Sequence, residues 1–74
     1  MERYANRGGS SGVMAFRIGD TSISVQFKGN PRIYIYSYYG GAGQSHVDNM
    51  KSLVLNGSGL NSYIKRYVNN LYDK

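Results

Sequence analysis

The stretch that decides the fold is RIYIYSYY, residues 32–39. Successive side chains of a strand point to opposite faces, so the period of two in this stretch separates aliphatic from aromatic side chains. The two isoleucines would lie on one face, and Tyr34, Tyr36 and Tyr38 on the other. What this protein can bind depends on whether the tyrosine row is open to solvent or covered.

Two further strands are predicted before this stretch, over residues 12–18 and 21–28. The link Gly19-Asp20 has glycine first and suits a type II′ hairpin turn, which pairs Phe16 with Ile23. In that register the large apolar side chains share one sheet face: Met14, Phe16, Ile18, Ile23, Val25 and Phe27.

The connection to the tyrosine-bearing strand is GNP, residues 29–31, in which the proline favours a loop. A three-residue loop pairs Gln26 with Tyr34 and Ser24 with Tyr36. This register places the tyrosines on the outer face and the isoleucines on the core face. Both hairpins then agree on which face is the core, and such agreement favours the assignment.

Two helices follow the third strand. Ser45 occupies an N-cap position with Asp48 three residues later, an arrangement typical of a capping box. The sequence NGSG, residues 56–59, ends this helix. A second helix is predicted over residues 60–72, with an apolar stripe of Leu60, Ile64, Tyr67 and Leu71. The sequence therefore predicts an α+β fold: a three-stranded antiparallel meander (β-β-β-α-α) with both C-terminal helices packed on the aliphatic sheet face.

The chain has 74 residues, which is enough for one small domain. We expect residues 1–11 to form a flexible tail, because they are polar and rich in Gly and Ser, and residues 12–74 to form a single domain. The formal charge of +5 favours polyanionic partners, either nucleic acid or an acidic protein surface, although net charge also serves solubility. No apolar stretch has membrane-spanning length, so a soluble, cytoplasmic protein is expected.

The chain resembles the KTSC domain, a short domain at the carboxyl end of some lysyl-tRNA synthetases. The resemblance rests on a Y-x-Y motif at residues 34–36, a following helix, and a G-x-x-(F/L)-N-x-x-I pattern at residues 57–64 with Lys65 after it. The chain departs from the family pattern at Leu60, where an aromatic residue is commoner, and at residues 40–44, where a proline-containing turn is frequent. The resemblance implies a small β-rich domain with helices, and its association with tRNA charging favours RNA.

The candidate binding residues all fall on the predicted outer sheet face: Arg17, Lys28, Arg32, Tyr34, Tyr36 and Tyr38. Aromatic faces stack on unpaired bases, and nearby cations neutralise phosphates. The alternative is that these tyrosines are strand-forming residues that lie under a helix or in a dimer interface.

No catalytic, metal or cofactor site is predicted. The chain has no cysteine, one histidine (His46) and four scattered acidic residues, so neither a zinc site nor a carboxylate pair is expected. The glycine-rich residues 40–43 lack the spacing of a P-loop and favour a connector. Asn61 is expected to have a structural role as a cap.

The sequence thus predicts a small non-catalytic binding module of bacterial or phage type that contacts RNA or single-stranded nucleic acid. The alternative is a protein-interaction module, either a phage or mobile-element protein that docks on a host protein or a homodimer through the tyrosine face. A monomer and a homodimer both remain open.

Overall fold

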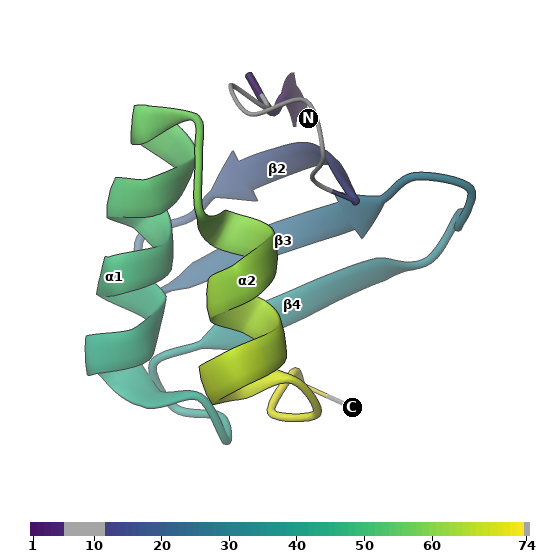
Figure 1. The fold of residues 1–74 in the computed structure, drawn as a ribbon. Helices are drawn as coiled ribbons and strands as arrows, with labels where there is room; N and C mark the ends of the chain where they lie inside the picture. The colour runs from purple at the N-terminus through teal and green to yellow at the C-terminus, as the bar shows by residue number, and fades with distance from the viewer. Residues whose placement is uncertain (6–11, 74) are drawn as a thin grey trace.

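The protein consists of a layer of helices packed on one face of an antiparallel sheet. The computed structural model describes residues 1–5 and 12–73. Within these residues four strands pair in chain order: β1 (Glu2–Arg3), β2 (Val13–Ile18), β3 (Ser22–Phe27) and β4 (Ile33–Ser37). The helical layer comprises α1 (Gly43–Asn56), α2 (Leu60–Tyr63) and the π-helical turn η1 (Ile64–Val68). Figure 1 shows the helices on one side of the sheet, which confirms the predicted α+β class. The predicted count of three strands is wrong, because β1 adds a fourth.

The short strand β1 brings the amino terminus into the sheet and the core. It pairs antiparallel with β2, and the Tyr4 N–H donates a hydrogen bond to the Met14 carbonyl (2.9 Å). The Tyr4 side chain is only 3% exposed, and its hydroxyl accepts a hydrogen bond from the Leu60 N–H (3.3 Å). The expectation of a flexible tail is therefore wrong for residues 1–5, and the rest of that predicted tail, residues 6–11, lies outside the described residues.

The β2–β3 hairpin keeps most of the predicted core face but not the predicted register. A hydrogen bond from the Gly19 N–H to the Ser22 carbonyl (2.8 Å) closes the turn one residue later than expected, so Phe16 pairs with Val25 and not with Ile23. A β-bulge between residues 13 and 15 then reverses the alternation. As a result Val13 is fully buried, whereas Met14, which was expected in the core, is exposed.

The β3–β4 register differs from the prediction by one residue, and this difference reverses the faces of β4. Tyr34 pairs with Val25, and Tyr36 pairs with Ile23, so both tyrosines lie on the core face. A slip of one residue moves every side chain of a strand to the opposite face. The isoleucines of β4 consequently face away from the helices and are exposed.

The loop between β3 and β4 explains the slip, because it is longer than expected. Gly29 adopts a left-handed conformation (φ 74°), and the Asn30 N–H donates to the Phe27 carbonyl (3.2 Å). The Asn30 side-chain oxygen accepts a hydrogen bond from the Arg32 N–H (2.9 Å). Asparagine side chains commonly stabilise turns in this way. The connection therefore spans residues 28–32 and not 29–31.

Helix α1 starts earlier than expected and ends where expected. It begins at Gly43, with Ala42 at the N-cap position, so the predicted N-cap Ser45 lies within the first turn. It ends at Gly57, which adopts a left-handed conformation (φ 81°) and donates its N–H to the Leu53 carbonyl (2.9 Å). A left-handed glycine is the usual end of a helix, so the predicted stop signal is confirmed.

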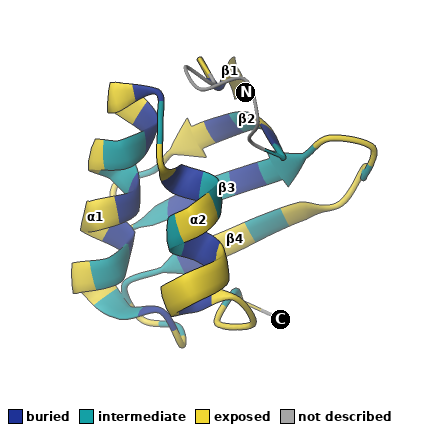
Figure 2. Ribbon diagram, viewed as in Figure 1, coloured by how far each residue is buried: buried dark blue, intermediate teal, exposed yellow. Residues whose placement is uncertain are grey.

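The second helical segment ends at Val68, four residues before the predicted end. Its last turn widens into a π-helix, in which the Asn69 N–H donates to the Ile64 carbonyl (2.6 Å). This widening rotates Val68 into the core and leaves Tyr67 and Leu71 exposed, against the predicted stripe. Figure 2 shows the buried side of both helices against the sheet; these residues are Val47, Met50, Val54, Leu60, Ile64 and Val68. None of the helices in the described ranges is long and apolar enough to cross a membrane.

Candidate ligand-binding pocket

The residues predicted to form one binding face are distributed over different parts of the molecule. Arg17 lies on the outer sheet face, because it pairs with Ser24 and points away from the helices. Tyr34 and Tyr36 lie on the opposite, helix-covered face. Lys28 and Arg32 lie at the two ends of the exposed loop between β3 and β4. The predicted platform, with tyrosines and cations side by side on the outer face, is therefore wrong.

The C-terminal segment covers the tyrosines of β4. The ring of Tyr72 packs edge-on against Tyr34 (centroids 4.8 Å apart) and against Tyr36 (6.3 Å). The Asp73 N–H donates to the Ile35 carbonyl of β4 (2.6 Å), which fixes this segment along the strand. Tyr36 is 1% exposed as a consequence and belongs to the core.

Tyr38, the third predicted stacking residue, links the end of β4 to α1. Its hydroxyl donates a hydrogen bond to the Asp48 carboxylate (2.5 Å) and accepts one from the Lys51 ammonium (3.3 Å). The same ammonium lies 4.9 Å from the centre of the Tyr38 ring, within cation–π distance. These contacts give Tyr38 a structural role, and they engage Asp48 in place of the predicted capping box.

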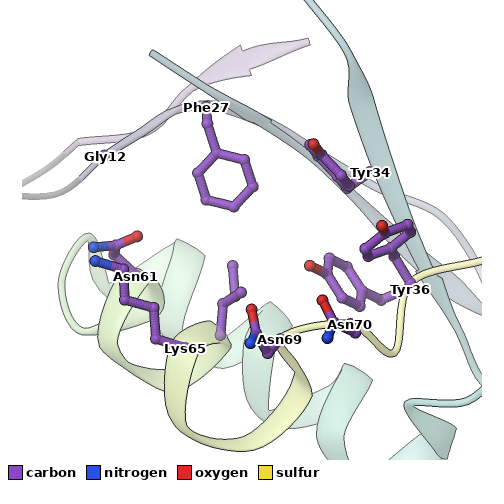
Figure 3. A pocket seen from close by; sticks show the side chains of 10 residues that line it. Gly12, Phe27, Tyr34, Tyr36, Asn61, Lys65, Asn69 and Asn70 are labelled. Atoms are coloured by element: carbon purple, nitrogen blue, oxygen red, sulfur yellow. The ribbon is translucent and has the colours of Figure 1, made fainter. Parts of the chain in front are cut away.

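A pocket opens where the sheet and the second helical segment diverge. It has a volume of about 550 Å³, which lies within the usual range for small-molecule sites. Figure 3 shows Phe27 and Tyr34 on the sheet side and Asn61, Lys65 and Asn69 on the helical side. The lining is completed by Gly12, Tyr36, Ile64, Asn70 and Tyr72.

The sheet side of the pocket is aromatic, and its rings are held in place by their neighbours. Phe27 packs edge-on against Tyr34 with centroids 5.6 Å apart. The Asn30 side chain donates a hydrogen bond to the Tyr34 hydroxyl (3.3 Å). Pre-positioned rings lose little conformational entropy when a planar ligand packs on them.

Arg32 supplies positive charge next to this aromatic wall. Its guanidinium carbon lies 4.9 Å from the centre of the Tyr34 ring and 5.1 Å from that of Tyr72. Both distances are typical of cation–π contacts, which hold the side chain over the rings while it stays exposed. The ammonium-bearing Lys65 lines the pocket from the opposite, helical side.

The hydroxyl of Tyr36 stays protonated throughout the physiological range. Burial, and next to it the neighbouring phenols of Tyr34 and Tyr72, raise the pKa of Tyr36 from 10.0 to about 12. The Tyr36 phenol therefore stays neutral, and the pocket lining also includes amide side chains that can donate and accept hydrogen bonds.

A second polar cluster lies between α1 and the second helical segment. The His46 Nδ1 lies 2.6 Å from the Tyr63 hydroxyl, which also accepts a hydrogen bond from the Asn49 side chain (3.1 Å). The His46 ring stacks on Tyr67 with centroids 5.9 Å apart. Through these contacts His46 ties the two helices together. No group of three or more metal-ligating side chains comes together within the described ranges.

Most of the pocket lining was missed by the sequence analysis, although part of it left a signal. Asn61, Lys65 and Asn69 recur at every fourth residue, a spacing that places them on one helical face. These residues were not combined into one site, because Asn61 was expected to act as a cap and Lys65 was noted only as the basic residue after the family motif. Tyr72 left no comparable signal, because the helix was predicted to continue through it.

Comparison of the chain with protein-family models, with curated proteins and with solved structures finds no match to any of them. The resemblance to the KTSC domain therefore stays a prediction that rests on the short motifs in the sequence.

Proposed function

We propose that this protein is a small non-catalytic module that binds single-stranded nucleic acid, with RNA favoured, by taking one unpaired base into the pocket between β4 and the second helical segment. The observation that carries the proposal is the pocket's composition: aromatic rings on one wall, and amide side chains with the cation Lys65 on the other. A cytoplasmic location belongs to the same proposal.

The aromatic wall supports stacking of a planar ligand. Phe27, Tyr34 and Tyr72 are partly buried and packed against the core, so each keeps some ring surface accessible to the cavity. Stacking of a base on an aromatic side chain contributes about 1–3 kcal/mol and requires no particular base. Stacking on aromatic rings is thus still the source of affinity, but the rings line a cavity and not an open sheet face.

The amide wall supports recognition of the base edge. Asn61, Asn69 and Asn70 each carry a donor and an acceptor, the same pair of groups that a base presents on its edges. A base that enters between the two walls would exchange its hydrogen bonds with water for hydrogen bonds with these amides.

The charges around the pocket support contact with the phosphates on either side of that base. Lys65 lines the cavity, Arg32 lies over the Tyr34 ring of its aromatic wall, and Lys28 is exposed in the loop before β4. Each phosphate contact of this kind makes the affinity depend on salt concentration. Arg17 and Tyr38 have no part in the proposed site.

A pair of neighbouring substitutions tests the proposal with the charge change held constant. Lys65→Gln removes a cation that lines the pocket, whereas Arg66→Gln removes an exposed cation next to it in η1 that does not line it. Binding of fluorescently labelled RNA and DNA oligonucleotides is measured by anisotropy at low salt.

We expect Lys65→Gln to weaken binding about fivefold and to flatten the salt dependence, because one phosphate contact is lost. Arg66→Gln should stay close to the wild type. Equal effects of both substitutions would mean that only net charge matters, and no binding by the wild-type protein would refute the function itself. Tyr38→Phe serves as a tyrosine control that leaves the pocket intact.

A further inference from the structure

The outer face of the sheet, opposite the helices, is divided into a cationic half and an aliphatic half. Residues that pair across antiparallel strands point to the same face. One row across the sheet runs Arg3, Ala15, Gln26 and Ile33, and the next runs Arg17, Ser24 and Ile35. Both rows begin with arginine on β1 or β2 and end with isoleucine on β4.

The aliphatic half is exposed to solvent. Ile33 is 48% exposed and Ile35 is 42% exposed, although Tyr36 on the same strand is buried. Two neighbouring isoleucines on an open sheet face are a feature of interaction surfaces. The residues between the two halves, Ala15 and Ser24, are small, so the centre of the face offers little obstruction to a partner that lies on it.

The cationic half has no acidic counterpart on this face among the described residues. Glu2 pairs with Phe16 and so points to the helix side. The other acidic residues lie in the β2–β3 turn, in α1 and in the C-terminal segment; they are Asp20, Asp48 and Asp73. Arg3 and Arg17 are thus placed to meet carboxylates from another molecule.

We propose that this face docks an acidic amphipathic helix of a partner protein. The strands β2 and β4 are two strand spacings apart, about 10 Å, which matches the diameter of one α-helix with its side chains. A helix lying over β3 would direct carboxylates toward Arg3 and Arg17 and apolar side chains toward Ile33 and Ile35. Arg and aliphatic side chains together are typical of protein interfaces.

A second copy of this chain fits the face less well. It would bring two further arginines to the interface, and none of its described acidic residues lies on that face. Nucleic acid also fits less well, because isoleucines offer no stacking surface for bases. The proposal concerns a different surface from the nucleic-acid pocket and is independent of it.

The test uses a synthetic helical peptide with glutamates along one face and leucines along the other, and a matched peptide in which lysines replace the glutamates. Both are titrated into isotopically labelled protein, and backbone amide shifts are recorded by NMR. We expect the acidic peptide to shift amides of β2, β3 and β4 and the lysine peptide to leave them unchanged.

Three variants then assign the contact. Arg17→Glu and Ile35→Ser should each weaken binding of the acidic peptide about fivefold or more. Arg66→Glu makes the same charge reversal on the helical layer and should leave binding unchanged. Folding of each variant is checked by its own NMR spectrum.

Several results would overturn the proposal. They are equal binding of both peptides, no binding of the acidic peptide, and equal loss of binding in Arg17→Glu and Arg66→Glu. A homodimer in light scattering that dissociates with Ile35→Ser would assign the face to a second copy. Oligonucleotide shifts that map to this face would assign it to nucleic acid.

Discussion

Raising the pH above 10 should destabilise this protein through Tyr36 in particular. In the unfolded chain this phenol ionises at its ordinary pKa of 10.0, whereas burial raises its pKa to about 12 in the folded protein. Between these values the unfolded chain gives up a proton that the folded chain retains, so the free energy of unfolding falls as the pH rises. Below pH 10 the phenol is protonated in both states and has no such effect.

The size of the effect follows from the difference between the two pKa values. At pH 11, one unit above the unfolded value and about one below the folded value, the loss is about 1.4 kcal/mol for this single group. With a urea m-value of about 1 kcal/mol/M for a domain of this size, the midpoint should move by about 1.4 M. The loss continues to grow until the pH passes the folded pKa.

Urea denaturation followed by circular dichroism, at pH 8.5 and at pH 11, measures this loss. Other groups also titrate in this range, so the informative quantity is the difference between the wild type and Tyr36→Phe, which keeps the ring but cannot ionise. The wild type should lose about 1.4 kcal/mol more than the variant. Tyr39→Phe removes a phenol that is 87% exposed and should behave like the wild type.

A Tyr36→Phe variant that loses as much stability as the wild type would refute this reasoning. That outcome would mean that Tyr36 ionises equally in both states, as it would on a solvated outer face. The experiment therefore distinguishes the observed register of β4 from the register predicted by the hairpin argument.

Two further predictions concern contacts that join distant parts of the chain. Tyr4→Phe removes the acceptor for the Leu60 N–H, so the free energy of unfolding measured in urea should fall by about 1–2 kcal/mol. An unchanged free energy of unfolding would contradict a role of Tyr4 in capping α2. In Gly40→Ala the new Cβ would overlap the Asp73 carboxylate, which must move and give up its hydrogen bond from the Ser37 hydroxyl. We expect a loss of about 1 kcal/mol from Gly40→Ala, a similar loss from Asp73→Ala, and no additional loss in the double variant; additive losses would show that the two sites are independent.

The parts of the fold that follow from local signals could be predicted from the sequence. Alternation identified the three longer strands, and Gly57 ended α1 where expected. The β1 strand could not be found in this way, because two residues carry no periodicity. Its position depends on Tyr4, whose partners are β2 and the distant Leu60.

The candidate site could not be predicted because it depends on the face that β4 turns toward the helices. Isoleucines are the expected core residues of such a strand, since aliphatic side chains are usually buried. The Asn30-stabilised loop shifts the register of β4 by one residue, so that the tyrosines and not the isoleucines face the core. A buried tyrosine removes a large ring surface from water, so burial of Tyr36 offsets the exposure of the isoleucines.

The choice between the two registers also determines what the protein can offer a ligand. With isoleucines inside, β4 would present the helices with an aliphatic surface that has no polar groups. With tyrosines inside, the same strand supplies aromatic rings that line one pocket together with the amide side chains of Asn61 and Asn69. Tyr72 supports this arrangement from the far end of the chain, since its ring packs on both Tyr34 and Tyr36. The pocket and the exposed isoleucine face thus have one common cause, the register of a single hairpin, and a variant that changed this register would lose both surfaces together.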